Sequence, residues 1–196
     1  PAVGEHPYQY VNNIPVSATA NADYQFGRWN VSGDATVDKP GSATGASFTI
    51  TGPLASATAN FAKAVDISSI SGGGKISIAD LADSKDGMKN ILVFDVTAEK
   101  NFKLTSSGGT GDCDIYVKQG MAPNLSDYFR KSTIDGSTES LKVDNPQSGK
   151  WFVLLYSASD FADVKLDIEV DSAVPDKPVL AGSISGTKVN LGWTGT

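Results

Sequence analysis

The chain has 196 residues, of which 40% are hydrophobic, and a formal net charge of −6. This size and apolar content can support about two compact units with their own cores. The 16 Lys and Arg residues are scattered along the chain, which argues against a nucleic-acid or anionic-membrane partner, because both require concentrated positive charge. A single cysteine excludes an intrachain disulfide. No apolar run approaches the roughly 20 residues that a membrane-spanning helix needs.

The residue pattern indicates an all-β fold. Short runs rich in Val, Ile, Thr and aromatic residues dominate, and no stretch keeps an apolar period of about 3.6 residues over several turns. We predict a small antiparallel β module in residues 1–63, a jelly-roll-like β-sandwich in 64–171, and a linker with the truncated first strands of another domain in 172–196. The first residues carry neither an initiator Met nor a signal-peptide core, so we expect an excised internal segment.

The first module is predicted from alternating runs separated by Asn-, Gly- and Pro-containing turns. Its predicted core consists of four aromatic residues, namely Phe26, Trp29, Phe48 and Phe61. Its motifs follow in the order V-x-A-x-A at 16–20, Y-x-F-x-x-W at 24–29 and T-A-N-F at 58–61. This order resembles bacterial surface repeats similar to the internalin B-repeat family, which implies an extracellular spacer or adhesive role. The predicted strands lie at 8–10, 14–20, 24–29, 47–50 and 57–61.

A glycine loop at 108–111 leads into a strand that carries two acids at alternate positions. Asp112, Asp114 and Tyr116 share one face of this strand, since successive side chains alternate. Two nearby carboxylates beside glycines can bind calcium, which favours oxygen ligands. Capping of a turn or ordinary hydrogen bonding carries more weight, and a hydrolytic carboxylate pair carries the least. Asp112 and Asp114 are therefore candidate calcium ligands.

The strand at 151–156 is apolar on both faces, with Trp151 beginning one face. Its other face carries Phe152, Leu154 and Tyr156, and a face that met only water would carry polar residues. Either another module covers these side chains, which is the favoured alternative, or they form an exposed binding patch. In the second case Tyr116, Tyr128 and Phe129 extend a flat aromatic surface suited to a collagen-like chain or a sugar ring.

The sequence offers no recognisable catalytic set. The single histidine, His6, and the single cysteine, Cys113, belong to different predicted modules. A nucleophile needs its base within hydrogen-bond reach, and catalytic zinc needs several His or Cys ligands. We therefore do not expect this segment to be an enzyme.

Several motifs follow in order within 64–171: F-x-V at 94–96, G-G-x-G-D-x-D-x-Y-V-x-x-G at 108–120, E-S-L-x-V at 139–143, N-P-x-x-G-x-W-F-V at 145–153 and F-x-D-V-x-L at 161–166. Together they resemble the bacterial pre-peptidase C-terminal domain, a non-catalytic β-sandwich found behind the catalytic domains of many secreted peptidases. Leu154 departs from the polar residue common in that family. The start of a strand pattern at 183–193 looks like a fibronectin type III-like domain.

The resemblance implies a non-catalytic accessory segment of a secreted bacterial protein, most simply a peptidase. Its partners would be an extracellular protein or polysaccharide and the neighbouring domains of the parent chain, and the segment itself would be a monomer. The alternative is a structural spacer, or a secretion or processing tail, with no ligand of its own. We expect the protein to act outside the cell.

Overall fold

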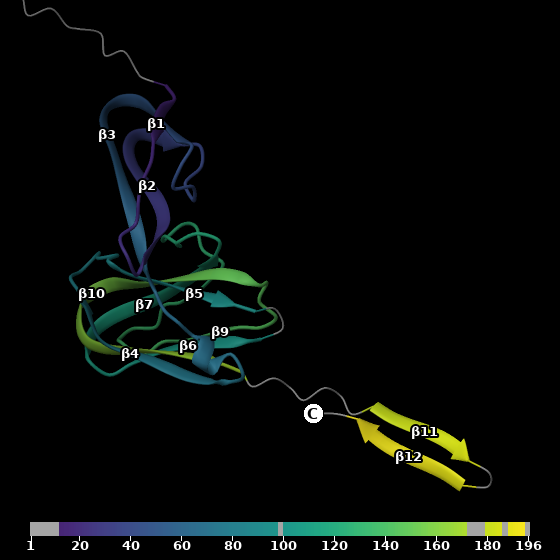
Figure 1. The fold of residues 1–196 in the computed structure, drawn as a ribbon. Helices are drawn as coiled ribbons and strands as arrows, with labels where there is room; N and C mark the ends of the chain where they lie inside the picture. The colour runs from purple at the N-terminus through teal and green to yellow at the C-terminus, as the bar shows by residue number, and fades with distance from the viewer. Residues whose placement is uncertain (1–11, 98–99, 172–178, 186–187, 195–196) are drawn as a thin grey trace, which may run out of the picture.

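The computed structural model describes residues 12–97, 100–171, 179–185 and 188–194, the last two ranges by their backbone alone. This part of the chain contains strands, one short 3-10 helix and no α-helix, which confirms the predicted all-β class (Figure 1). None of its helices could therefore cross a membrane. The elements are β1 Ile14–Val16, β2 Tyr24–Val37, β3 Ala46–Ala64, η1 Ser68–Ile70, β4 Gly74–Asp83, β5 Asn90–Val96, β6 Phe102–Ser107, β7 Thr110–Gln119, β8 Arg130–Ser132, β9 Ser140–Val143, β10 Gly149–Val170, β11 Val179–Ser185 and β12 Lys188–Thr194.

The N-terminal module is a long antiparallel hairpin of β2 and β3, with β1 paired to the start of β3. Its core contains three of the predicted aromatic residues, Phe26, Trp29 and Phe48, and Phe61 packs against Phe26 at its margin. The Trp29 ring lies 5.4 Å from Phe26 and 5.3 Å from Phe48, and Phe26 lies 6.0 Å from Phe61, measured between ring centroids. Trp29 and Phe48 are buried, so packing explains these residues.

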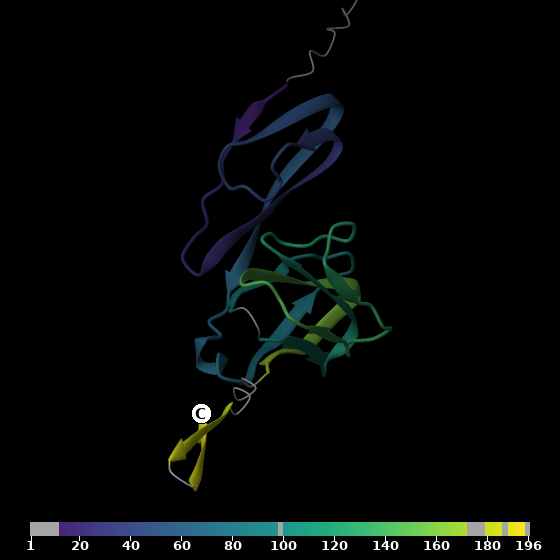
Figure 2. The same cartoon turned by 90° about the vertical axis from the view of Figure 1, so that its right-hand side faces the viewer.

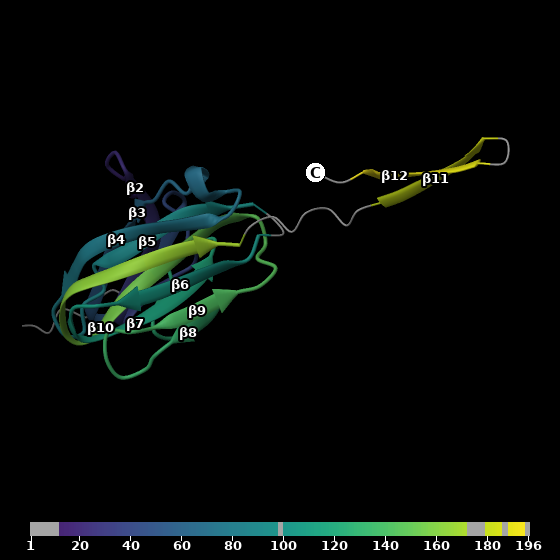
Figure 3. The ribbon, with the colours of Figure 1, turned by 90° about the horizontal axis from the view of Figure 1, so that it is seen from below.

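The sandwich is organised around β10, a single strand of 22 residues. Its first half pairs with β5 on one side and β7 on the other, and β7 pairs with β8. Its second half pairs with β4 and β6, and β6 pairs with β9. The strand thus passes through both layers (Figure 3). Residues 151–156 of β10 pair with residues 114–119 of β7.

An inner core fills the space between the two layers. It takes one face of each strand, as an alternating pattern requires. Its fully buried members include Phe102, Leu104, Ile115, Val117, Val153, Leu155, Leu166 and Ile168.

The hairpin and the sandwich share a sheet. The last residues of β3, Lys63 and Ala64, pair in parallel with Leu92 and Val93 of β5, so β3 runs from the hairpin into the sandwich (Figure 2).

A second contact joins the hairpin to the loop after β7. Arg28 Nη1 donates to the carbonyl of Ala122 at 3.0 Å and to Asp127 at 3.2 Å, and Ala122 N–H donates to the carbonyl of Gly27 at 3.0 Å. A Cβ on Gly27 would lie 2.9 Å from the Ala122 Cβ, so only glycine permits this approach.

The C-terminal strands β11 and β12 form a separate antiparallel pair. The predicted linker at 172–178 and the predicted strand at 8–10 lie outside the described residues. The likenesses to internalin repeats and to a fibronectin type III-like domain stay predictions.

Candidate functional site

The glycine loop between β6 and β7 brings two backbones together. Gly108, Gly109 and Gly111 all have positive φ. A Cβ on Gly109 would lie 2.1 Å from the carbonyl oxygen of Ala162, and one on Gly111 would lie 1.9 Å from that of Asp160. These distances leave no room for a side chain, so the loop closes β7 against β10.

The two acids after this loop have different surroundings. The Asp112 carboxylate accepts the N–H of Gly136 at 3.1 Å, which is the hydrogen-bonding role that the sequence also allowed. Asp114 is 8% exposed. Its burial, with the nearby charges of Asp112 and Glu139, raises the pKa of Asp114 to about 6. Asp114 therefore resists ionisation more than a surface carboxyl.

The predicted calcium site stays a prediction. Glu139, the third acid nearby, is fully buried and accepts the Ile134 N–H at 2.5 Å and the hydroxyl of Ser132. In the described part of the chain, no group of three or more His, Cys, Asp or Glu side chains is arranged to hold a metal ion. Calcium takes six to eight oxygen ligands, many more than Asp112 and Asp114 alone provide.

The predicted aromatic patch is mostly covered. Phe152 and Leu154 are 2% and 0% exposed, on the face of β10 opposite Trp151, as the alternation predicts. They form an outer cluster with Ala62 of the hairpin and Ala122 of the loop after β7, and that cluster also contains Ile91, Val93 and Tyr116. Phe152 and Leu154 therefore already pack within the chain, which is the alternative that the sequence favoured.

The tyrosines of this face also pack on one another. Tyr116 is 5% exposed, and its ring lies 5.4 Å from Tyr128 and 6.4 Å from Tyr156. The Tyr156 hydroxyl donates to Asp86 at 2.7 Å. Lys131 Nζ lies 5.7 Å and 5.4 Å from the rings of Tyr116 and Tyr128. Tyr116 is thus a buried support rather than an accessible ligand-binding residue.

Two residues of the predicted surface are exposed: Tyr128 at 37% and Phe129 at 57%. Phe129 rests edge-on against Trp151, with ring centroids 5.4 Å apart. Leu125 and Ile134 are exposed at 39% and 62%, and the sequence analysis did not single them out. Both residues lie between β7 and β9, in a segment that contains only the short strand β8. Such loop-rich segments usually run over the surface, and this could have indicated that their side chains are exposed.

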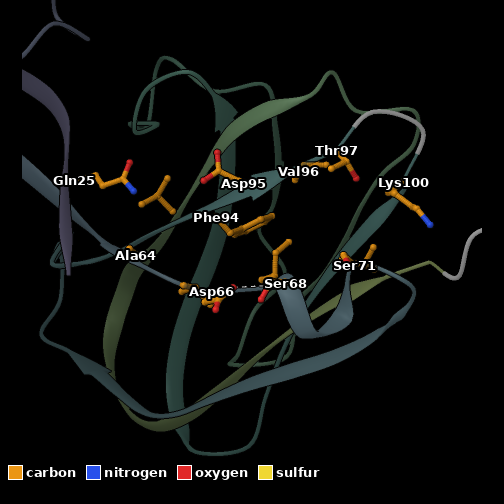
Figure 4. Close-up of a pocket in the computed structure, with 14 residues that line it drawn as sticks. Gln25, Ala64, Asp66, Ser68, Ser71, Phe94, Asp95, Val96, Thr97 and Lys100 are labelled. Carbon is orange, nitrogen blue, oxygen red and sulfur yellow. Dashed lines mark hydrogen bonds between the residues drawn. The ribbon is translucent and has the colours of Figure 1, made fainter.

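A groove of about 450 Å³ lies where β3 meets β5 (Figure 4). One wall is the chain from Ala64 to Ser71, and the other is the end of β5 and the residues after it. The sequence analysis missed this groove, because its walls come from segments whose closeness depends on the tertiary pairing of β3 with β5. The lining residues are Gln25, Ala64, Val65, Asp66, Ile67, Ser68, Ser71, Val93, Phe94, Asp95, Val96, Thr97, Lys100 and Val170.

Neither residue considered for nucleophilic chemistry forms a catalytic pair in the described part of the chain. Cys113 is fully buried, and its burial raises the pKa of the thiol to about 11, so the thiol stays protonated at neutral pH. His6 lies outside the described residues.

Comparison with protein families gives a match over residues 90–157 to the bacterial pre-peptidase C-terminal domain. This range is shorter than the 64–171 suggested by the sequence motifs. Residues 90–157 contain β5, β6, β7, β8, β9 and the first part of β10, and so most of the layer that carries the outer cluster.

Three curated relatives are bacterial proteases. Xanthomonalisin from a Xanthomonas species is 42% identical over 55 residues, which cover 28% of this chain and 7% of that protein. A zinc metalloprotease from Helicobacter pylori and a hemagglutinin/proteinase from Vibrio cholerae are each 29% identical over 92 residues, or 47% of this chain, and the matches cover 36% and 15% of those proteins. The matches thus cover only 7% to 36% of the length of these three relatives.

Two solved structures align with part of this chain. PliG from Aeromonas hydrophila, a periplasmic inhibitor of g-type lysozyme, is 14% identical with a TM-score of 0.40, over 55% of this chain and 94% of that one. The pre-peptidase C-terminal domain of a collagenase from Bacillus anthracis is 13% identical with a TM-score of 0.33, over 50% and 89%.

Proposed function

We propose that this chain, whose residues 90–157 form a bacterial pre-peptidase C-terminal domain, is a non-catalytic accessory segment of a secreted protease. The observation that carries the proposal is the family match, since the reported relatives are proteases of which the matched segment covers only 7% to 36%. The segment would act outside the cell, beside a catalytic domain that lies elsewhere in the parent protein.

The packing supports a role in holding parts of the protease at a set separation. β3 joins the sheet of β5, and Arg28 is tied to the loop after β7 through Ala122 and Asp127. Asp127 also pairs with Lys118, which supports the loop from the strand side. Such a junction resists bending, because movement would break both strand pairing and a buried hydrogen bond.

Within this role, the exposed loop residues Tyr128 and Phe129 would contact an extracellular protein such as a collagen-like chain, or a polysaccharide. Each offers aromatic area at low conformational cost. Burying one such ring would stabilise a complex by about 1.5–3 kcal/mol. The basic side chain of Lys131, close to the Tyr128 ring, would add a charged contact.

The alternative is a spacer, or a secretion or processing tail, that binds nothing. One observation favours it: Phe152 and Leu154, which would have given the largest apolar area, are buried.

A binding assay with the whole chain separates the two. The chain is incubated with insoluble collagen, chitin and cellulose, and the bound fraction is measured against protein concentration. We expect binding to at least one of these, weakened by about 10- to 100-fold per residue in Tyr128→Ala and Phe129→Ala. Tyr24→Ala, at a 47% exposed tyrosine of the hairpin, is the matched control and should bind normally. Failure of the unmodified chain to bind any of the three would favour the spacer.

A further inference from the structure

The edge of β5 is only partly paired. β10 covers one side of β5 along its length, from Asn90 to Val96. On the other side, β3 pairs with β5 at Leu92 and Val93 alone, and the Val65 N–H adds one more bond to the Val93 carbonyl at 2.8 Å. Beyond Val93, no strand of the described ranges pairs with this side of β5.

The backbone of Asp95 faces this open edge. Hydrogen-bonding groups of successive residues in a strand point to opposite sides, so residues two apart point the same way. The Val93 carbonyl points toward β3, away from β10, and the N–H and C=O of Asp95 therefore do the same. The residue opposite Asp95, Lys150, agrees, because its carbonyl points away from β5 and accepts the Gly120 N–H at 2.9 Å.

The open edge forms one wall of the groove described above. Figure 4 shows Asp95, Val96 and Thr97 along one side and Asp66 and Ser68 along the other, as the two chains diverge from the β3–β5 pairing. Half of the lining residues are aliphatic or aromatic. Four extended residues span about 13 Å, so the stretch from Phe94 to Thr97 can template a short added strand.

The walls of the groove are acidic near the hairpin. The Asp66 carboxylate accepts the Ser68 N–H at 2.8 Å, and this bond lowers the pKa of Asp66, which keeps it charged. Asp95 forms an ion pair with Lys150 at 3.0 Å but its side chain is 70% exposed. Lys100 is the one basic residue of the described lining. The groove therefore complements a peptide that carries positive charge.

We propose that this groove binds an extended segment of a partner polypeptide, which adds as a strand to the open edge of β5. Small aliphatic side chains of the segment lie on the apolar lining, and a Lys or Arg lies near Asp66 and Asp95. The added strand takes up the pairing of β5 where β3 leaves it, so its binding continues an interface that the fold already contains. The groove contains neither Tyr128 nor Phe129. Binding of a peptide here therefore goes beyond the accessory role proposed above.

The test uses the whole chain and two fluorescein-labelled peptides, Val-Lys-Val-Thr-Val and Val-Glu-Val-Thr-Val, in fluorescence anisotropy titrations. We expect the Lys peptide to bind several-fold more tightly. Asp95→Pro should weaken its binding at least tenfold, because proline lacks the N–H that faces the groove yet is tolerated on an open strand edge. Asp95→Asn, the matched control, keeps the N–H and leaves Asp66 charged, so it should only reduce the preference for Lys over Glu.

Two results would overturn the proposal. One is absence of binding of either peptide to the unmodified chain at millimolar concentration, and the other is unchanged binding by Asp95→Pro. Amide hydrogen exchange on the unmodified chain gives a measurement that does not depend on the folding of this variant. Saturating Lys peptide should slow exchange at Asp95 at least tenfold, and an unchanged exchange rate would also refute strand addition.

An open strand edge can also pair with a second copy of the same chain. Sedimentation velocity without peptide distinguishes this self-association from binding of a partner, because the proposal predicts a monomer at every concentration. A dimer that Asp95→Pro dissociates would instead assign the groove to self-association and overturn the proposed partner.

Discussion

Replacing Gly111 by alanine tests whether the glycine loop exists to bring β7 and β10 together. Gly111 has φ +85°, and Gly120, at the end of β7, has a nearly identical φ of +82°. Alanine at either position adopts an unfavourable left-handed backbone, at about 1–2 kcal/mol. The positions differ in space: a Cβ on Gly111 lies 1.9 Å from the Asp160 carbonyl oxygen, whereas a Cβ on Gly120 has no neighbour within 4 Å.

The difference in space sets the expected magnitude. The Asp160 carbonyl must move by more than about 1 Å to accept the new methyl group, which adds about 2–3 kcal/mol by analogy with overpacked cores. Gly111→Ala should therefore lower the free energy of unfolding by about 3–5 kcal/mol, and Gly120→Ala by about 1–2 kcal/mol. At about 2–4 °C per kcal/mol, the melting temperature of Gly111→Ala should fall by about 10 °C.

Urea unfolding followed by circular dichroism measures both variants under the same conditions. The reasoning is refuted if the two alanines cost the same within about 0.5 kcal/mol, since that would leave backbone strain as the whole effect and the contact with β10 without weight.

Asp114→Asn should raise the free energy of unfolding at pH 7.5 by up to about 3 kcal/mol. The pKa of Asp114 is raised from 3.8 to about 6 in the folded chain, so the stability due to its proton is complete below pH 3.8 and is lost as the pH rises through about 6. Urea unfolding at pH 4 and 7.5 should therefore show that Asp114→Asn is more stable than the unmodified chain only at the higher pH. Cys113 should react with a thiol reagent at least 100-fold more slowly in the folded chain than in urea, because it is buried and protonated; rapid labelling of the native chain would contradict this. Asp127→Ala should lower stability by about 1–3 kcal/mol, since it leaves the buried Arg28 without its charged partner, and an unchanged urea midpoint would show that this tie is dispensable.

The sequence was most informative where a local period determines the outcome. The two faces of 151–156 followed from strand alternation, and their separation into the inner core and the outer cluster is what the structure shows. The same holds for the positive φ of Gly111, because glycine clusters mark such backbones.

The sequence was least informative about what lies over those faces. The side chains that pack with Phe152 and Leu154 include Ala62 and Ala122, which are small, distant in the sequence and without a recognisable hydrophobic pattern. An apolar second face indicates that something covers it, but not whether the cover is a ligand or the chain itself. The groove beside Asp95 has the same origin, since it depends on where β3 leaves β5.

The length of β10 gives its two halves different roles in strand alignment. The first half is apolar on both faces, so a shift of one residue there would exchange Trp151 for Phe152 at little cost in hydrophobicity. From Val164 to Val170 the second half alternates strictly, with Lys165, Asp167 and Glu169 on the face opposite the inner core. A shift there would place charges in the core. Because both halves belong to one continuous strand, the charged half opposes a shift of the whole strand, and the apolar half could shift alone only if the irregular pairing between Ser157 and Leu166 changed with it. Residues that follow the family match thus help to hold its layer in place.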